Sequence, residues 1–510
     1  MTAGFATTEG TLRFRDKAST LVKEFNVLGR TNLNVSQVGF GSYRVDVRIS
    51  EHKNALAKAL RMGVNLIDTS ANYADGNSEK LIGEVLQTLF ASSELQRDEV
   101  VIISKGGYIQ GQNFERVSQQ VGHSKSELAI GSFESEIVRY SQGLWHSIHP
   151  EFLEDQITRS LERLQLETLD VYLLHNPEYF IQWAIKEEAI PEDEIRDMYE
   201  ERIKKALEYL ETEVERGRIK WYGISSNTFP KAEESIDRTS LERIWKNLSA
   251  SENHFGVIQL PMNLYERGGI LEKNQVSSSR SVIEFAREHG IGVLINRPLN
   301  AIKDEILIRL GDYPEREFPP EDDISVLVHD LKLMEDEFKN GALKDIALNP
   351  QAYDAVKKML SVGEWLDNKR WSAFHSFEEW RDLLYSVLRP RLQYVFDVLR
   401  NSSLEDKGIF IELQEYAESV DEVVDHITNY YLTKSNERAS FIHTKLREVL
   451  PEPLEVLSLP QKAVLLLRSI PGVSSVLVGM RSEEYVDDTI YGLQVAKLEQ
   501  AEEKWEEITL

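Results

Sequence analysis

Short apolar runs alternate along this chain with longer amphipathic stretches, and several of the apolar runs end in polar residues. Three such strings are NLIDTSANY, VIISKGG and DVYLLHNPE. A parallel strand that is buried on both faces has this pattern when its carboxyl end opens into a site. We therefore expect the chemistry of this protein to lie at strand ends.

The number of apolar runs indicates the fold. Candidate strands start at Val35, Val64, Val100, Leu169, Ile219, Val257, Ile291 and Ser475. Amphipathic segments such as EHKNALAKALRMG and EFLEDQITRSLERLQ lie between them and predict helices. Eight parallel strands with intervening helices predict an α/β protein with a (β/α)8 TIM barrel. Before the first strand, FNVLGRTNLNVS predicts two short extended pieces around a turn, which could plug the N-terminal end of the barrel.

Two long segments interrupt this alternation. Residues 107–149 are longer than a strand-to-helix loop needs, leave the carboxyl face of the barrel, and contain aromatic residues for either a substrate lid or a local core. Residues 300–458 are large enough for a domain, and stretches such as ISVLVHDLKLMEDEF predict helices. The predicted organisation is an N-terminal extension over 1–24, barrel strands 1–7 over 25–299, a mostly helical insertion after the seventh strand over 300–458, and completion of the barrel over 459–510.

Composition excludes several classes of function. Lys and Arg number 59 against 85 Asp and Glu, a net charge of -26, so the chain repels nucleic acids and anionic membranes. The absence of cysteine excludes disulfides, thiolate metal sites and cysteine nucleophiles. With no long apolar stretch, we expect a soluble, cytoplasmic protein without a membrane anchor. The spacing of His146 and His149 would suit a metal only on a helix that Pro150 interrupts, so we predict no metal site.

The order and spacing of these strings resemble the aldo-keto reductases, over roughly residues 25–299 and 459–493. NLIDTSANYADGNSEKLIGEVL resembles the second strand and helix of that family, DVYLLHNP its fourth strand, GRIKWYGISSN its fifth, and IPGVSSVLVGMRS its last. The resemblance implies a (β/α)8 barrel that binds NADP(H) extended across its C-terminal mouth, and an enzyme that interconverts a carbonyl and an alcohol.

The resemblance also implies a set of four catalytic residues. Tyr73 is expected to give its proton to the carbonyl oxygen, and Lys105 to favour the phenolate by its charge. Asp68 would hold Lys105 in a buried ion pair, and His175 would orient the substrate oxygen. Taken singly, the four residues also fit a surface tyrosine, an extended lysine at a strand end, a helix cap and a core histidine.

The cofactor residues implied by the resemblance lie at several strand ends. Gly41 and Ser42 would line the cleft, Ser226, Asn227 and Gln259 would bind the nicotinamide carboxamide, and Arg481, Ser482 and Asp488 would hold the 2′-phosphate and adenine. Ordinary turn chemistry and a solvated arginine are the simpler alternatives. The chain departs from the family pattern after the seventh strand, where INRPLNA replaces a stacking aromatic residue, and Arg297 is expected to meet the pyrophosphate instead.

We therefore predict an NADP(H)-dependent oxidoreductase that acts on a small-molecule carbonyl or alcohol. The alternative is a nucleotide-binding regulatory or redox-sensing subunit that acts through a protein partner docked on the helical insertion. The same insertion could also form an oligomer.

Overall fold

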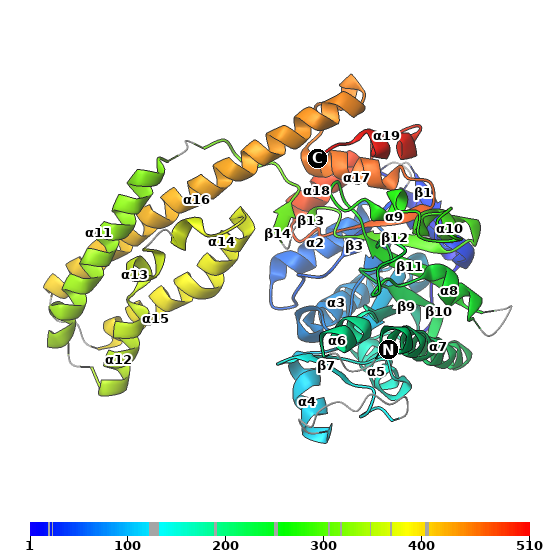
Figure 1. Ribbon diagram of the computed structural model, residues 1–510, viewed down its shortest axis with the longest axis horizontal. Coiled ribbons are helices and arrows are strands. Elements are labelled where there is room, and N and C mark those ends of the chain that lie inside the picture. The colour runs from blue at the N-terminus through cyan, green and yellow to red at the C-terminus, as the bar shows by residue number, and fades with distance from the viewer. Residues whose placement is uncertain are drawn as a thin grey trace. The chain divides into compact units, whose positions relative to one another are not determined.

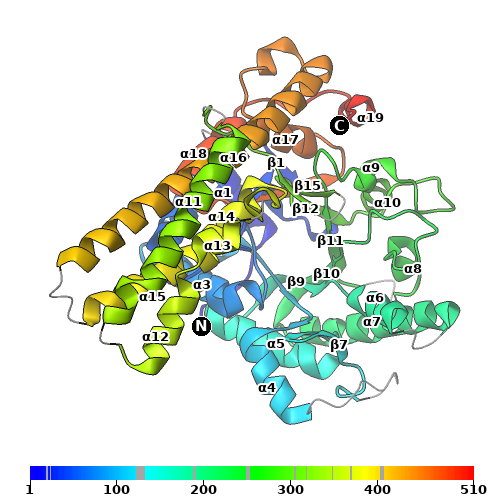
Figure 2. The same ribbon diagram turned by 60° about the vertical axis from the view of Figure 1, so that its left-hand side comes forward.

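The computed structural model describes residues 1–510 except 19–20, 23, 122–131, 188–190, 249–252, 304–305, 317–318, 347, 368–369 and 403–406. It divides into two compact units, each with its own core. Unit 1 comprises Met1–Ala301 and Val449–Leu510, and unit 2 comprises Ile302–Glu448. Figures 1 and 2 show the barrel of unit 1 and the mostly helical unit 2. Within the described residues, no helix is both long and apolar enough to cross a membrane.

Unit 1 is a closed barrel of eight parallel strands, which confirms the predicted fold class. In chain order the strands are β3 (Val38–Gly41), β4 (Leu66–Asp68), β5 (Val101–Gly106), β9 (Leu169–His175), β10 (Ile219–Ser225), β11 (Phe255–Pro261), β12 (Gly292–Asn296) and β15 (Val473–Val478). Nearly all of their residues are buried, because the barrel interior is filled by side chains and helices cover the outside. The first predicted strand began too early, since Val35 belongs to the preceding hairpin.

Helices follow the strands in the order that the amphipathic segments predict. The outer helices are α2 (Ser50–Arg61), α3 (Asn77–Ala91), α5 (Pro150–Leu164), α6 (Tyr179–Lys186), α7 (Glu192–Glu215), α8 (Leu241–Lys246), α9 (Gly268–Leu271), α10 (Val282–Glu288), α17 (Leu459–Arg468), α18 (Glu483–Gly492) and α19 (Ala501–Glu507). Ser281 and Ser458 begin α10 and α17 with capping boxes, in which side chain and backbone satisfy each other's free donors.

The segment before the first barrel strand forms a hairpin that closes one end of the barrel. Strands β1 (Phe25–Val27) and β2 (Asn34–Ser36) pair antiparallel around a 3-10 turn at Gly29–Thr31. Leu28, Leu33 and Val35 are buried in one cluster with side chains from the barrel strands. Gly29 has φ +49, and a Cβ there would lie 2.3 Å from the Gly292 backbone nitrogen, so only glycine fits. Helix α1 (Thr8–Ala18) precedes this hairpin.

The long loop after β5 has its own small sheet. Strands β6 (Tyr108–Ile109), β8 (Leu144–His146) and β7 (Val138–Ser141) pair antiparallel in that order, with α4 (Gly111–Val121) between β6 and β7. Phe114, Phe133 and Trp145 pack in a local core with neighbouring apolar residues, whereas Tyr108 and Tyr140 lie outside it. The middle of the predicted loop, residues 122–131, lies outside the described residues.

Unit 2 follows β12 and is mostly helical, as predicted for the insertion. A two-stranded sheet, β13 (Asn300–Lys303) and β14 (Ile306–Arg309), leads into α11 (Glu321–Asn340), α12 (Pro350–Met359), α13 (Val362–Leu366), α14 (Phe377–Leu383), α15 (Arg389–Asn401) and the long α16 (Lys407–Val449). A π-helical turn, Leu384–Leu388, joins α14 to α15.

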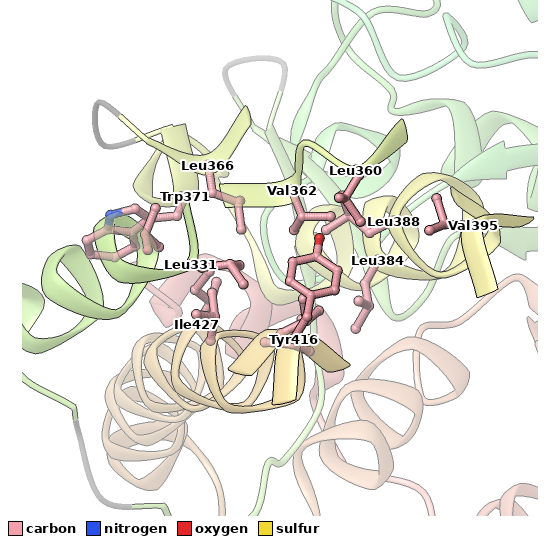
Figure 3. Packing of buried hydrophobic residues seen from close by; sticks show 14 of the residues in the cluster. Leu331, Leu360, Val362, Leu366, Trp371, Leu384, Leu388, Val395, Tyr416 and Ile427 are labelled. Carbon is pink, nitrogen blue, oxygen red and sulfur yellow. The ribbon is translucent and has the colours of Figure 1, made fainter. Parts of the chain in front are cut away.

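The core of unit 2 contains a buried acid among apolar side chains. Figure 3 shows Val362 and Leu384 beside the ring of Tyr416, and Leu331, Ile427 and Trp371 farther along the same cluster. The Tyr416 hydroxyl donates to Glu335, which also accepts the backbone N–H groups of Gly363 and Glu364 at the start of α13. These bonds satisfy the free donors at that helix end, so the buried carboxyl has a structural role.

Candidate active site

The predicted catalytic residues meet at the carboxyl ends of the barrel strands. The strand register pairs Gly41 of β3 with Asp68 of β4, and Ser225 of β10 with both His175 of β9 and Gln259 of β11. Polar side chains at the ends of neighbouring parallel strands lie on the same edge of the barrel. Residues far apart in the sequence are therefore brought to one mouth.

Lys105 is the centre of this polar cluster. Its side chain is fully buried, with 0% exposed, and Nζ donates to Asp68 Oδ2 at 2.8 Å and to the Thr69 carbonyl at 2.8 Å. The same Nζ lies 3.3 Å from the hydroxyl oxygen of Tyr73. An ammonium without partners would be costly to bury, so the carboxylate and the carbonyl are what keep this lysine in place.

Tyr73 stands in a turn with unusual backbone geometry. It begins the 3-10 segment Tyr73–Gly76, in which Ala74 and Asp75 have φ values of 47° and 55°, in the left-handed region. Non-glycine residues adopt this region at a cost, and such residues gather at functional sites. The turn brings the phenol back over the end of β5.

Electrostatics keep the Tyr73 phenol protonated. Burial, followed by the charge of Asp68 and by Tyr43, raises the pKa of Tyr73 well above its usual value. Burial also lowers the pKa of Lys105, against the opposing effect of Asp68. The expected pull of Lys105 toward the phenolate is thus outweighed, and at neutral pH the hydroxyl is a proton donor.

The second oxygen of Asp68 connects the lysine to three more strands. Gln259 Nε2 donates to Asp68 Oδ1 at 2.7 Å. Gln259 Oε1 in turn accepts from Ser225 Oγ at 3.1 Å and from Asn296 Nδ2 at 3.2 Å. The amide of Gln259 is therefore held at both ends, which fixes the orientation of the carboxylate. The sequence did not identify Ser225, the neighbour of the predicted Ser226.

His175 is buried at the end of β9. Its Nδ1 lies 3.0 Å from Ser70 Oγ, and its backbone carbonyl accepts from His146 Nε2 at 2.7 Å. Burial, then the charges of Lys105 and His146, hold the pKa of His175 well below its usual range. The imidazole is therefore neutral at physiological pH. His146 is engaged with this backbone, and the described residues contain no cluster of ligands for a metal.

A row of aromatic rings runs past Tyr73 and His175. Neighbouring rings meet edge to face with centroids 4.7 to 5.9 Å apart, in the order Tyr43, Tyr73, His175, Tyr108, Tyr179 and Tyr140. Asn176 Nδ2 donates to the Tyr108 hydroxyl at 2.7 Å, and Tyr43 is 66% exposed. The row forms an aromatic wall beside the phenol. Sequence reasoning missed Tyr43 and Tyr179, because nothing local marks rings that meet only in the fold.

Ser226 and Asn227, both predicted to bind the carboxamide, differ in the burial of their side chains. Ser226 Oγ is buried and contacts Thr228 and Thr239 hydroxyls at 3.1 and 2.9 Å. The Asn227 side chain is exposed, while its backbone N–H donates to Glu178 Oε1 at 2.8 Å. Glu178 is 1% exposed, and burial raises its pKa to about 7. This acid, which supports the turn after β10, was not identified from the sequence.

The residues predicted to line the cleft and those predicted to hold the 2′-phosphate and adenine lie around the ends of β3 and β15, which are neighbours in the barrel. Ser42 Oγ donates to the Asp68 carbonyl at 2.8 Å. Arg481 follows β15, and Ser482 begins α18 by accepting the Tyr485 N–H at 3.3 Å. Asp488 lies within α18, where its carboxylate accepts from the side chain of Gln461 at 2.8 Å.

Two polar atoms at the carboxyl end of β12 fit a nicotinamide dinucleotide. The buried Oδ1 of Asn296 and Nε of Arg297 have no hydrogen-bond partner among the described residues. A carboxamide NH2 could satisfy the acceptor and a phosphate oxygen the donor. Arg297 has φ 52, and its Nη2 donates to Glu266 Oε1 at 2.6 Å, so its guanidinium is already held in one orientation.

Known proteins resemble this chain over its barrel. Residues 37–302 match the model of the Aldo/keto reductase family. The chain is 26% identical to the NADH-specific methylglyoxal reductase of Escherichia coli over 159 residues, 29% of this chain and 40% of that protein. It is 28% identical to the L-galactose dehydrogenase of Arabidopsis thaliana over 173 residues, 33% of this chain and 43% of that protein. The matches thus span less than half of the length of these two relatives.

The solved structures that resemble this chain are more distant in sequence. The aldo-keto reductase AKR11C1 from Bacillus halodurans is 14% identical, with 96% of each chain covered and a TM-score of 0.47. An aldo/keto reductase from Klebsiella pneumoniae, solved with NADP and acetate, is 15% identical, with 94% of this chain and 92% of that chain covered and a TM-score of 0.40. Because the family model covers more than half of the sequence, this chain belongs to the aldo/keto reductase family.

Proposed function

We propose that the protein is an NADP(H)-dependent oxidoreductase that interconverts an aldehyde or ketone and an alcohol, with Tyr73 as general acid and base. The observation that carries this proposal is the position of the Tyr73 hydroxyl, 3.3 Å from a fully buried Lys105 that is itself paired with Asp68 at 2.8 Å. A phenol beside a buried cation at a strand end is suited to proton transfer.

The chain's own residues account for the proton and its control. When bound, a reduced nicotinamide supplies the hydride. Tyr73 donates its proton to the carbonyl oxygen, and the raised pKa of Tyr73 keeps that proton available at neutral pH. As negative charge develops on the phenol oxygen, Lys105 stabilises it at short range. Asp68 keeps the lysine in place, and His175 hydrogen-bonds the substrate oxygen and orients it.

Other residues fit the binding of the dinucleotide. Asn296 would bind the carboxamide through its free Oδ1, and Gln259 would hold Asn296 in position. Gly41 and Ser42 would line the cleft, and Ser226 and Asn227 would support the turn beside it. Arg297 would bind the pyrophosphate through its buried Nε. Arg481, Ser482 and Asp488 would hold the adenosine 2′-phosphate end, which favours NADP(H) over NAD(H) because a guanidinium pairs well with a phosphate.

The test is the Tyr73→Phe variant, which keeps the ring and removes only the hydroxyl. We expect NADPH binding, followed by fluorescence titration, to remain, and turnover in NADPH oxidation over a panel of aldehydes and ketones to fall by about 10²- to 10⁴-fold. Tyr385→Phe, at an exposed tyrosine of unit 2, is the matched control and should retain turnover. Full activity of Tyr73→Phe would contradict the proposal. Tight NADPH binding by the wild type without turnover on any carbonyl would favour a regulatory subunit instead.

A further inference from the structure

Ser70, two residues after β4, contacts the ring of His175. It is buried, and its Oγ lies 3.0 Å from His175 Nδ1, 2.7 Å from Asn72 Oδ1 and 3.2 Å from the Lys105 carbonyl oxygen. A serine hydroxyl has one proton to donate and two lone pairs that accept. Ser70 can therefore serve only one of these three neighbours as a donor.

The real competition is between Asn72 and His175. The Lys105 carbonyl is the most distant of the three neighbours at 3.2 Å, and it also accepts the backbone N–H of Ala71 at 3.1 Å. Asn72 is fixed from its other side, because its Nδ2 donates to Gln110 Oε1 at 3.1 Å. Gln110 follows β6 and is partly exposed. A series of hydrogen-bonded side chains thus runs from Gln110 through Asn72 and Ser70 to the His175 imidazole.

This series of hydrogen bonds ends at His175 Nδ1 and therefore acts on the tautomer of His175. Burial and nearby charges keep the ring neutral, so it holds one proton, on either Nδ1 or Nε2. The rings of Tyr73 and Tyr108, with centroids 5.9 and 4.7 Å away, pack against the imidazole and hold it in place, while His146 Nε2 bonds the His175 backbone carbonyl at 2.7 Å. With the ring fixed, the hydrogen bond at Nδ1 decides what Nε2 can do.

We propose that Ser70 is a positioning residue that sets the tautomer of His175, and that the Asn72 amide sets the direction of the Ser70 proton. This inference rests on the proposed carbonyl chemistry. When Ser70 donates to His175 Nδ1, the ring proton is on Nε2, which can then donate to a carbonyl oxygen. When Ser70 donates to Asn72 Oδ1, His175 donates from Nδ1 and Nε2 is an acceptor, which a carbonyl oxygen cannot use.

The distances in the structure favour the second of these arrangements. Asn72 Oδ1 faces Ser70 Oγ at 2.7 Å, the shortest of the three contacts, which favours donation by Ser70 to Asn72 and a proton on His175 Nδ1. If the amides of Asn72 and Gln110 turn over together, Nδ2 of Asn72 faces Ser70 as a donor. The Ser70 proton then has His175 Nδ1 as its acceptor, and the ring becomes the form that binds a carbonyl.

The direct readout is the ¹⁵N spectrum of His175 in full-length protein with selectively labelled histidine, because protonated and bare ring nitrogens resonate far apart. We expect the wild type without substrate to show Nδ1–H. Asn72→Asp, whose carboxylate only accepts, should keep that form, whereas Asn72→Leu, which removes the competing acceptor, should shift it to Nε2–H. Ser70→Ala should leave a mixture of both tautomers. Unchanged ring signals in both Asn72→Leu and Ser70→Ala would overturn the proposal.

The kcat values of the variants give a second test, because the proposal predicts their order. We expect Ser70→Ala to lower kcat by about tenfold with unchanged NADPH affinity, as the loss of one positioned hydrogen bond implies. Asn72→Asp should lose more kcat than Asn72→Leu, an order that a purely structural role of Asn72 would not produce. Ser160→Ala, at a buried serine that contacts Arg163 at 3.5 Å, is the control and should match the wild type.

The two proposals fail in distinguishable ways. If Tyr73→Phe abolishes turnover while Ser70→Ala changes neither kcat nor the ¹⁵N signals, the oxidoreductase assignment stands and the role of Ser70 is wrong. If the wild type turns over no carbonyl, the oxidoreductase assignment fails, and the ¹⁵N spectra still decide whether Ser70 sets the His175 tautomer. Asn72 is partly exposed, so its variants give this answer even if Ser70→Ala does not fold.

Discussion

Replacing Glu178 by Gln tests how strongly the turn after β10 depends on a buried acid. Glu178 is 1% exposed, and its Oε1 accepts the Asn227 N–H at 2.8 Å. Asp237 and three phenols, Tyr108, Tyr179 and Tyr199, lie near enough to interact with it. With no cation among these neighbours, the ionised carboxylate is poorly compensated.

The magnitude follows from the pKa of Glu178, which burial raises from 4.5 in the unfolded chain to about 7 in the folded protein. Between these values the folded protein holds a proton that the unfolded chain has released. Stability from this group is therefore fully present below pH 4.5 and is lost as the pH rises through about 7. A pKa difference of about 2.5 corresponds to roughly 3 kcal/mol. Gln keeps an acceptor for Asn227 and does not titrate.

The assay is hydrogen–deuterium exchange of the β9 and β10 amides from pH 5 to pH 9, corrected for the intrinsic exchange rate, because it reports opening of the barrel separately from unit 2. We expect the protection of Glu178→Gln to rise relative to wild type with increasing pH, by up to about 3 kcal/mol. Glu178 is the N-cap of α6, and the exposed Glu187 is the C-cap of that helix. Glu187→Gln is the control and should follow the wild type. Parallel profiles of the wild type and Glu178→Gln would refute the reasoning.

Two further substitutions test the ion pair and the proposed pyrophosphate contact. Lys105→Met leaves the Asp68 carboxylate buried without its cation, so we expect the free energy of unfolding, measured with urea, to fall by about 3–5 kcal/mol. Adding Asp68→Asn to the same chain should largely restore this stability. Equal stability of the single and double variants would count against the ion pair. Arg297→Ala should weaken NADPH binding by about 10- to 100-fold, because a charge-assisted hydrogen bond to phosphate is lost. An unchanged dissociation constant would show that Arg297 does not contact the cofactor.

The strand ends were predictable because each carries its own signal. The strings that end in Asp68, Lys105 and His175 are apolar before they are polar, and strands buried on both faces require this pattern. The side-chain direction at the end of β10 was harder to predict. Successive residues of a strand point to opposite faces, so Ser225 reaches Gln259 while its neighbour Ser226 faces a cluster of threonine hydroxyls.

Contacts between segments that are distant in the sequence could not be predicted from local patterns. Ser70 and His175 are 105 residues apart, and Gln259 and Asp68 are 191 apart. In unit 2, the stretch WRDLLYSVLRPRLQYVFDVL has one helical period throughout, yet a π-helical turn ends α14 and Pro390 lies in the first turn of α15. Proline lacks an amide proton and is accommodated where a helix begins.

The sequence by itself determined the alternation of strands and helices, the barrel with a helical insertion, and the residue types available at the strand ends, because hydrophobic period and local propensity are written along the chain. Only the tertiary structure decided the pKa directions of Tyr73 and His175, the shared bonds of Asp68, and the aromatic row from Tyr43 to Tyr140. Desolvation and hydrogen-bond partners depend on which side chains close over a group, and that is settled when the barrel closes.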